Sequence, residues 1–450
     1  MQNVTLIIAV ILVTLVLNLR PRKALVIYIA SLLWYPSYLA VSIGTIDIVL
    51  GRFVVGALFL RCLCDDKIRT RFKWSRLDKW VALSMIIYVG ITFYTRPTWM
   101  MVENRGGFIM DTWLAYMVAR FIITDRASLI YVVKSVSIIL LPLAILGCIE
   151  AVSGWQPFVP LRRFSPWNPE YGVTNVGGRW GFTRAIGPFQ HPIMFGGCFA
   201  MFLPLIWYLR YEKKEWKSLA YIFSVTAVVG ALSSMSSGPW IMIIAIVFCF
   251  LLERRKKWVK PALFAFIILC ILIQISSSTA FYYVLFNYGS KLGGAGLHRA
   301  MLIDIAIKNF DQWWLVGTKG LDPGWGHYFH MDHTDVTNEY LLAGIKYGIL
   351  GIIVLCCMLF VAFKQIIAAY KKAITPETKS LYWSLGSGLF AIVVVWTSVS
   401  FFGQLMPLFY CVFGMTGSSV LFLQNSKRTI VNRKLRKLKK VVVLQNTCKV

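Results

Sequence analysis

The chain has 450 residues, of which 58% are hydrophobic and 15% are charged, and its mean hydropathy is +0.66. Ordinary soluble domains carry about 25% charged residues, so this composition excludes a typical soluble globular protein. The net charge of +28 does not indicate nucleic-acid binding, because the lysines and arginines gather in short segments between apolar runs. Such segments are typical of the cytoplasmic loops of membrane proteins.

Apolar runs of about 17–25 residues recur along the chain, and a helix of this length crosses a hydrocarbon core of roughly 30 Å. We predict transmembrane helices at 3–19, 24–42, 45–62, 79–95, 107–124, 128–149, 192–209, 219–235, 239–252, 261–279, 339–363, 381–400 and 403–424. With the N-terminus outside, these spans place the main basic segments on one face, which the positive-inside rule assigns to the cytoplasm. The sequence therefore predicts an all-α polytopic membrane protein of about 12–13 transmembrane helices, with a cytoplasmic C-terminus.

Only two of the loops between the predicted helices are long. The chain divides into N-terminal transmembrane helices (1–149), a first extracytoplasmic loop (150–191), central helices (192–279), a second extracytoplasmic loop (280–338), C-terminal helices (339–424) and a basic cytoplasmic tail (425–450). Long loops often carry function, so we expect the substrate to be handled outside the membrane. Both loops are rich in aromatic residues, which stack on sugars and also anchor proteins among lipid headgroups.

The first long loop ends in the segment TRAIGPFQHP, which leads into a predicted helix. Pro192 suits the first turn of a helix, so Gln190 and His191 are expected at an outward-facing helix N-terminus, which favours anions. Arg184, with Arg179 close by, adds a bidentate donor for phosphate. We predict that Gln190, His191 and Arg184 bind a phosphate-bearing substrate. The alternative is that Arg184 pairs with lipid headgroups.

The second long loop contains the segment GLHRAMLIDIAIKNF, residues 296–310. Its apolar residues recur at helical spacing beside charged ones, which predicts a short amphipathic helix at the membrane interface. Arg299 lies near the start of this helix. We predict that Arg299 is a second contact for phosphate, with headgroup anchoring as the alternative.

The segment HTDVTNEYLL connects the second loop to the next predicted span. His333, Asp335 and Glu339 are each eligible as a general base that takes a proton from an acceptor hydroxyl, and Asn338 lies beside them. Glu339 could instead only stabilise the N-terminal end of its helix. The three histidines between 327 and 333 resemble metal-ligand spacing. Because no partner motif accompanies them, we predict neither a metal nor a cofactor.

Four segments together resemble the bacterial O-antigen ligase and Wzy-type polymerase superfamily. They are TRAIGPFQHP, SSMSSGPW, HRAMLIDIAIKNFDQWWLVGTKG and TNEYLLAGIKYGILG, and they fall within about residues 180–352. The resemblance implies a GT-C-like membrane glycosyltransferase at the extracytoplasmic face of the bacterial inner membrane, with polyprenyl-pyrophosphate-linked glycans as donor and acceptor. Ser237 stands where the family often has Arg, and Thr337 where it often has His, which leaves the identity of the general base open.

The resemblance also implies that Arg184 and Arg299 contact the pyrophosphate, with His191, Asn338 and Glu339 at the reaction centre. Two arginines and helix N-termini can neutralise the leaving group, so the expected reaction is metal-independent and inverting. We expect a polymerase of exopolysaccharide or O-antigen repeat units, with O-antigen ligase as the nearest sibling. The rival hypothesis is a transporter or flippase of polyprenyl-linked glycans. Expected partners are membrane lipids and other polysaccharide assembly and export proteins, and no nucleic acid.

Overall fold

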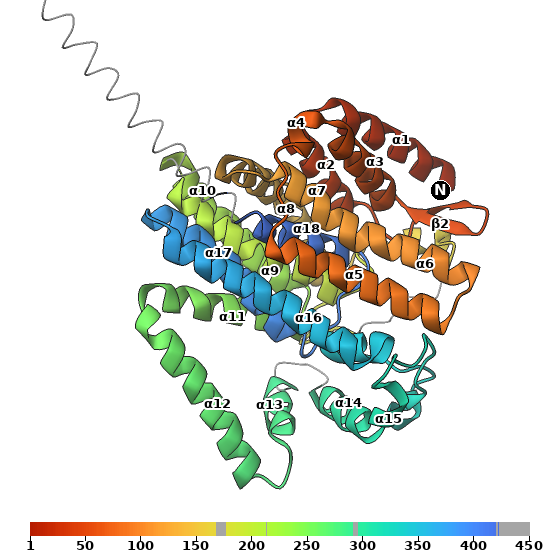
Figure 1. The fold of residues 1–450 in the computed structure, drawn as a ribbon, viewed down its shortest axis with the longest axis vertical. Coiled ribbons are helices and arrows are strands. Elements are labelled where there is room, and N and C mark those ends of the chain that lie inside the picture. The colour runs from red at the N-terminus through yellow and green to blue at the C-terminus, as the bar shows by residue number, and fades with distance from the viewer. Residues whose placement is uncertain (168–176, 213, 291–295, 420–421, 423–450) are drawn as a thin grey trace, which may run out of the picture.

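The structure is a computed structural model that describes residues 1–167, 177–212, 214–290, 296–419 and 422. It is mostly helical (76%), and most of its helices pack side by side in one bundle (Figure 1). The helices before the first long loop are α1 (Gln2–Asn18), α2 (Pro21–Trp34), α3 (Leu50–Cys64), α4 (Asp66–Arg69), α5 (Arg76–Thr95), α6 (Trp99–Ile109), α7 (Ala115–Ile122) and α8 (Arg126–Ser153). Those after it are α9 (Pro192–Tyr208), α10 (Lys214–Ser233), α11 (Ser237–Arg254), α12 (Val259–Ser276), α13 (Phe281–Ser290), α14 (Gly296–Lys308), α15 (Phe310–Trp313), α16 (Glu339–Lys372), α17 (Pro376–Val395) and α18 (Leu405–Gly417).

Within the described residues, eight helices are long and apolar enough to cross a membrane, namely α5, α8, α9, α10, α11, α12, α16 and α17. The prediction of a mostly helical, multi-pass membrane protein is confirmed at this level. The other predicted spans coincide with shorter helices: α1, α2, α3, α18 and the stretch from α6 to α7. A π-helical turn, Met110–Leu114, joins α6 to α7. Helix α9 lies at the centre and packs against α10, α11 and α17, whereas α12 projects away from the bundle (Figure 1).

A β-hairpin interrupts what we predicted as two helices meeting near residue 43. Strands β1 (Ala40–Ile43) and β2 (Ile46–Val49) pair in antiparallel register. The residue before Pro36 is held in an extended conformation, which ends α2, and Gly44 makes the turn with φ of +62°. The segment is rich in Val and Ile, which favour strands. The helical prediction is therefore wrong over these residues.

The candidate site residues of both long loops lie at one end of the bundle, which we call the loop end. The backbone N–H of Ala185, from the first loop, donates to the carbonyl of Ser233 at the end of α10 (3.1 Å). The N–H of Glu339, at the start of α16, donates to the carbonyl of Trp396, just after α17 (2.9 Å). Two loops separated in sequence by the central helices (192–279) are thereby fixed to helix ends of the bundle.

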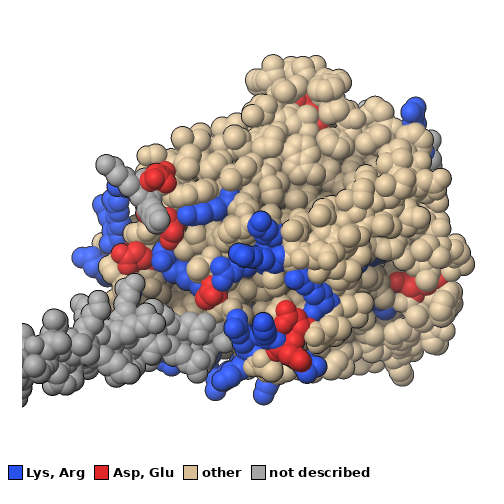
Figure 2. Space-filling view, turned by 90° about the horizontal axis from the view of Figure 1, so that it is seen from above, with Lys and Arg blue, Asp and Glu red and all other residues tan. Residues whose placement is uncertain are grey.

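Charged side chains pair at the opposite end of the bundle. Arg126 at the start of α8 pairs with Glu212 (2.7 Å), and Arg210 pairs with Glu253 near the end of α11 (3.0 Å). The space-filling view in Figure 2 shows Lys and Arg gathered with several carboxylates over one part of the surface, beside a broad area with few charges. The two ends of the bundle therefore differ. The long loops lie at the loop end, and ion pairs between short connections lie at the opposite end.

A kink in α16 attaches the second loop to the bundle. Gly348 has φ of +71°, which frees the next N–H, that of Ile349, to donate to the carbonyl of Trp314 (2.7 Å). A Cβ at position 348 would lie 2.3 Å from the carbonyl oxygen of Leu315, so only glycine fits. The kink therefore holds the segment after α15 against α16 and fixes the position of α14 and α15.

Candidate functional site

The structure confirms a helix N-terminus at the end of the first loop. Pro192 is the first residue of α9, and His191 is its N-cap. The Nδ1 atom of His191 accepts a hydrogen bond from the backbone N–H of Ile193 (3.1 Å). An accepting Nδ1 carries no proton, so the neutral ring presents its Nε2–H away from the helix.

Arg184 is buried within the protein, with only 8% of the residue exposed. Its Nη2 donates to the hydroxyl of Ser236, just before α11 (2.9 Å), and its carbonyl accepts from the amide of Gln156 (3.0 Å). Glu150, near the end of α8, accepts from the backbone N–H groups of Ile186 and Gly187 (2.7 and 2.9 Å). The loop is thus tied to two helix ends. Arg184 points into protein, which disfavours the headgroup alternative.

Arg299 is also buried, with 7% exposed, and lies on the predicted amphipathic helix of the second loop, now α14. Burial lowers the pKa of Arg299, and the nearby charge of Arg179 lowers it further, while Asp335 opposes the shift. Burial also lowers the pKa of Arg184 to about 10, again with a contribution from Arg179. Arg179 therefore lies within electrostatic range of both arginines, one from each long loop.

These three residues and Arg162 form what we call the arginine cluster. Arg162 follows α8 and donates to the backbone carbonyl of Gln190 (2.9 Å). In the described part of the chain, three buried guanidinium nitrogens of the cluster have no hydrogen-bond partner: Nη1 of Arg179, Nε of Arg184 and Nε of Arg299. Leaving a charged group buried without full pairing costs several kcal/mol. An anion in contact with the cluster can supply the missing acceptors.

The cluster acts on His191 as well. Burial lowers the pKa of His191 to about 4, and the charges of Arg184, Arg162 and Arg179 add to the effect. The imidazole is therefore neutral near pH 7. It can donate one hydrogen bond from Nε2 to an anion held by the arginines, and it is a poor general base because its conjugate acid is disfavoured.

The three candidate bases lie in different surroundings. The charge of Asp335 raises the pKa of both Arg299 and His298, against the effect of burial, so Asp335 lies within electrostatic range of the arginine cluster. His333 is exposed and lies near Asp322, whose pKa it helps to lower. Of the three, Asp335 is the candidate that the structure brings to the arginines.

Glu339 and Asn338 are engaged by the protein itself. Oε2 of Glu339 accepts from the backbone N–H of Phe401 (2.9 Å), and the residue lines a small cavity of about 60 Å³ together with Lys346. Asn338 caps α16: its Oδ1 accepts from the N–H of Leu341 (3.1 Å) and its Nδ2 donates to the carbonyl of Thr397 (3.0 Å). These contacts assign Asn338 to holding α16 against α17, a role that its type at a helix start indicates.

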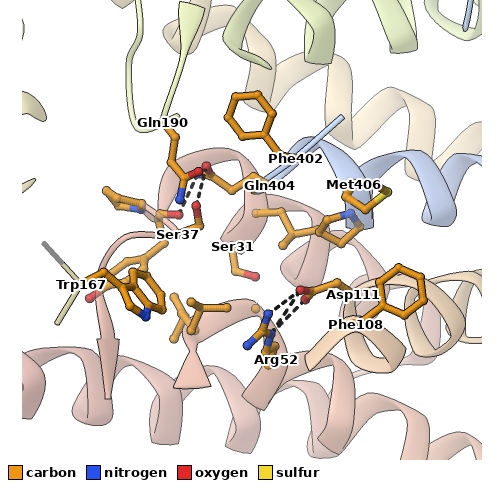
Figure 3. A pocket seen from close by; sticks show the side chains of 18 residues that line it. Ser31, Ser37, Arg52, Phe108, Asp111, Trp167, Gln190, Phe402, Gln404 and Met406 are labelled. Carbon is orange, nitrogen blue, oxygen red and sulfur yellow. Dashed lines mark hydrogen bonds and ion pairs between the residues drawn. The ribbon is translucent and has the colours of Figure 1, made fainter. Parts of the chain in front are cut away.

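A cavity of about 240 Å³ is lined in part by Gln190 (Figure 3). The backbone carbonyl of Gln190 accepts from Arg162 of the arginine cluster, so the cavity and the cluster are neighbours. The ion pair between Arg52 and Asp111 and the side chains of Ser31 and Trp167 also line the cavity. Sequence reasoning found Gln190 but missed Arg52 as a site residue. The available signal was a pair of opposite charges, Arg52 and Asp111, inside apolar segments, where ionisable residues are rare and often functional.

Among the described residues, no group of three or more His, Cys, Asp and Glu side chains is placed to hold a metal ion. His327 instead contacts the backbone carbonyl of Gly324 through Nδ1 (2.6 Å). No protein-family model matches the chain, and no curated protein matches its sequence.

Proposed function

We propose that the protein is a membrane glycosyltransferase of GT-C-like architecture that polymerises polyprenyl-pyrophosphate-linked repeat units at the extracytoplasmic face of a bacterial inner membrane. The observation that carries this proposal is the arginine cluster. It joins residues from both long loops, three of its four arginines (Arg162, Arg184 and Arg299) are buried, and three of its guanidinium nitrogens lack partners among the described residues. A diphosphate offers several acceptor oxygens and negative charge, which match such donors.

The chemistry follows from the leaving group. A hydroxyl of the acceptor sugar attacks the anomeric carbon, the bond from that carbon to the pyrophosphate oxygen breaks, and the configuration inverts. The arginines stabilise the charge that develops on the departing pyrophosphate, and the Nε2–H of His191 adds a donor. The hydroxyl proton passes to a carboxylate. Asp335 is our first candidate for this base because it lies within electrostatic range of Arg299.

The extracytoplasmic location of the site is inferred from charge. The loop end carries the two long loops, and the opposite end carries the short basic connections that the positive-inside rule assigns to the cytoplasm. Donor and acceptor glycans would therefore reach the cluster after transport across the membrane. Other polysaccharide assembly and export proteins are the expected partners.

The direct test is deletion of the gene followed by complementation. Loss of a polymerase predicts that single repeat units accumulate on the lipid carrier, whereas loss of a ligase predicts that full-length polymer accumulates there. Arg184→Ala and Arg299→Ala are expected to fail in complementation at normal expression. Arg163→Ala, an exposed arginine of the same first loop, is the matched control and should restore polymer. Normal polymer from both cluster variants would refute the proposal.

A flippase of the same lipid is the second candidate, because Arg52 and Asp111 form an ion pair next to a cavity within helical segments. The two functions differ in product. Purified protein in liposomes with lipid-linked repeats should lengthen the glycan if it is a polymerase, and should only move the lipid between leaflets if it is a flippase. Addition of EDTA should leave lengthening unchanged, because arginines neutralise the pyrophosphate in our proposal.

A further inference from the structure

The cavity beside the arginine cluster differs from it in charge. Nη2 of Arg52 contacts Oδ2 of Asp111 at 2.7 Å, and Nε lies 3.2 Å from both carboxylate oxygens. The two opposite charges cancel, and the side chains keep 24% and 26% of their surface exposed. A neutral pair that still offers donors and acceptors suits an uncharged ligand with several hydroxyls better than an anion.

The helix that carries Asp111 is distorted around this pair. Asp111 lies in the π-helical turn Met110–Leu114, and π-helical turns within α-helices occur frequently at functional sites. Gly107, one turn earlier, leaves room for Arg52, because a Cβ there would lie 2.7 Å from the guanidinium carbon. The chain thus keeps an irregular turn and a glycine at the position where the ion pair reaches the cavity.

An amide and aromatic faces complete the lining. In the described part of the chain, no hydrogen bond reaches the side chain of Gln190, whereas the amide of Gln404 is fully used by the hydroxyl of Ser37 and two backbone carbonyls. Trp167 and Phe402 remain 38% and 41% exposed. Figure 3 shows Trp167, Gln190 and the ion pair arranged around the same space. Aromatic faces, an amide and a paired carboxylate are the groups that bind sugar rings.

We propose that this cavity is a subsite for one uncharged sugar ring of the lipid-linked glycan. The inference rests on the proposed function and deepens it. Gln190 lines the cavity and the next residue, His191, interacts with three of the arginines, so a sugar and its pyrophosphate would occupy neighbouring positions. A volume of about 240 Å³ is below the ~300–1,000 Å³ of typical drug-sized sites, which suits a single sugar ring.

Thermal stability of the purified full-length protein tests the subsite. The probes are free monosaccharides at tens of millimolar: neutral hexoses, N-acetylhexosamines and hexuronic acids. A ligand that binds only the folded state raises the midpoint of thermal unfolding. We expect at least one neutral sugar to raise the midpoint of the wild type, and hexuronic acids to leave it unchanged. Trp167→Ala and Gln190→Ala should lose at least half of the shift.

The matched control is Trp155→Ala, which removes an exposed tryptophan of the same loop that does not line the cavity. It should keep the full shift. The proposed subsite would be refuted if no sugar raised the unfolding midpoint of the wild type. It would also be refuted if sugar raised the midpoint of both cavity variants as much as that of the control.

A second probe separates this inference from the proposed function. Inorganic pyrophosphate should stabilise the wild type and Trp155→Ala through the arginine cluster. If pyrophosphate does not stabilise the wild type, but the sugar-induced shift of the midpoint is lost in Trp167→Ala, the cavity is a sugar site and the proposed pyrophosphate-dependent function is refuted. If pyrophosphate stabilises the wild type, but Trp167→Ala keeps the full sugar-induced shift, only the proposed sugar subsite is refuted.

Discussion

Replacing Arg184 by methionine should stabilise the empty protein and weaken its binding of pyrophosphate. Folding lowers the pKa of Arg184 from 12.5 to about 10, mainly by burial. Each pKa unit corresponds to about 1.4 kcal/mol, so holding the charge in the folded state costs about 3 kcal/mol. Water at the exposed edge screens part of this cost, which leaves about 1–3 kcal/mol. Removing the guanidinium leaves no new unpaired group at Ser236, whose hydroxyl donates to the carbonyl of Ser234 (2.8 Å).

The sign of this effect fixes its dependence on pH. Because the pKa of a base is lowered in the folded state, the cost is fully present below about pH 10 and disappears only as the pH rises toward 12.5. The unfolding midpoint of Arg184→Met should therefore exceed that of the wild type by a similar amount from pH 6 to pH 9, about 1–5 °C.

Pyrophosphate should reverse the order of the two proteins. Loss of charge-assisted hydrogen bonds worth ~1.5–3 kcal/mol weakens binding about 10- to 100-fold. In a thermal unfolding assay, increasing concentrations of inorganic pyrophosphate should therefore raise the unfolding midpoint of the wild type much more than that of Arg184→Met. Arg163→Met, which changes an exposed arginine of the same loop, should behave as the wild type. A less stable empty Arg184→Met, or equal stabilisation of both proteins by pyrophosphate, would refute the reasoning.

Three further predictions concern single positions. His191→Leu removes the helix cap and should cost about 1 kcal/mol, whereas His191→Asn should retain most of the stability in a denaturation assay. Because folding lowers the pKa of His191 from 6.5 to about 4, wild-type stability should decline as the pH falls from 6.5 to 4, and His191→Asn should lack that part of the decline. Gly348→Ala places a Cβ 2.3 Å from a carbonyl oxygen, so folded protein should be lost in size-exclusion chromatography; a normal elution profile would contradict the assigned kink. Asp335→Asn should lower the rate of glycan transfer about 10²–10⁴-fold while inorganic pyrophosphate still stabilises the protein, and an unchanged rate would remove Asp335 as the base.

Local signals explain which parts of the fold could be predicted. Pro192 after a polar residue marked the start of α9, and apolar spacing marked α14 around Arg299, because both signals lie within one or two turns of the chain. The hairpin formed by β1 and β2 was not predicted, because a nearly continuous apolar sequence has no hydrophobic periodicity that distinguishes a strand from a membrane helix. Its β-branched residues and Pro36 were the usable signs.

The site was predictable only in part, for a related reason. Arginines in outer loops stood out against the charge bias, which singled out Arg184 and Arg299. The pairing of Arg52 with Asp111 joins residues 59 positions apart, and that distance in sequence carries no local pattern. Likewise, Asp335 and Glu339 are both carboxylates in the same segment, and only the tertiary structure brings Asp335 within electrostatic range of Arg299 and Glu339 against the backbone of Phe401.

The most direct test is the reaction itself. Lipid-linked repeat units extracted from the deletion strain would be added to purified protein in liposomes, and the length of the lipid-linked glycans followed by mass spectrometry. We predict a ladder of products that differ by one repeat, with one polyprenyl pyrophosphate released per bond formed, and no ladder from Arg184→Ala. Repeats that stay at their original length with folded wild-type protein, or an equal ladder from Arg184→Ala, would contradict the account.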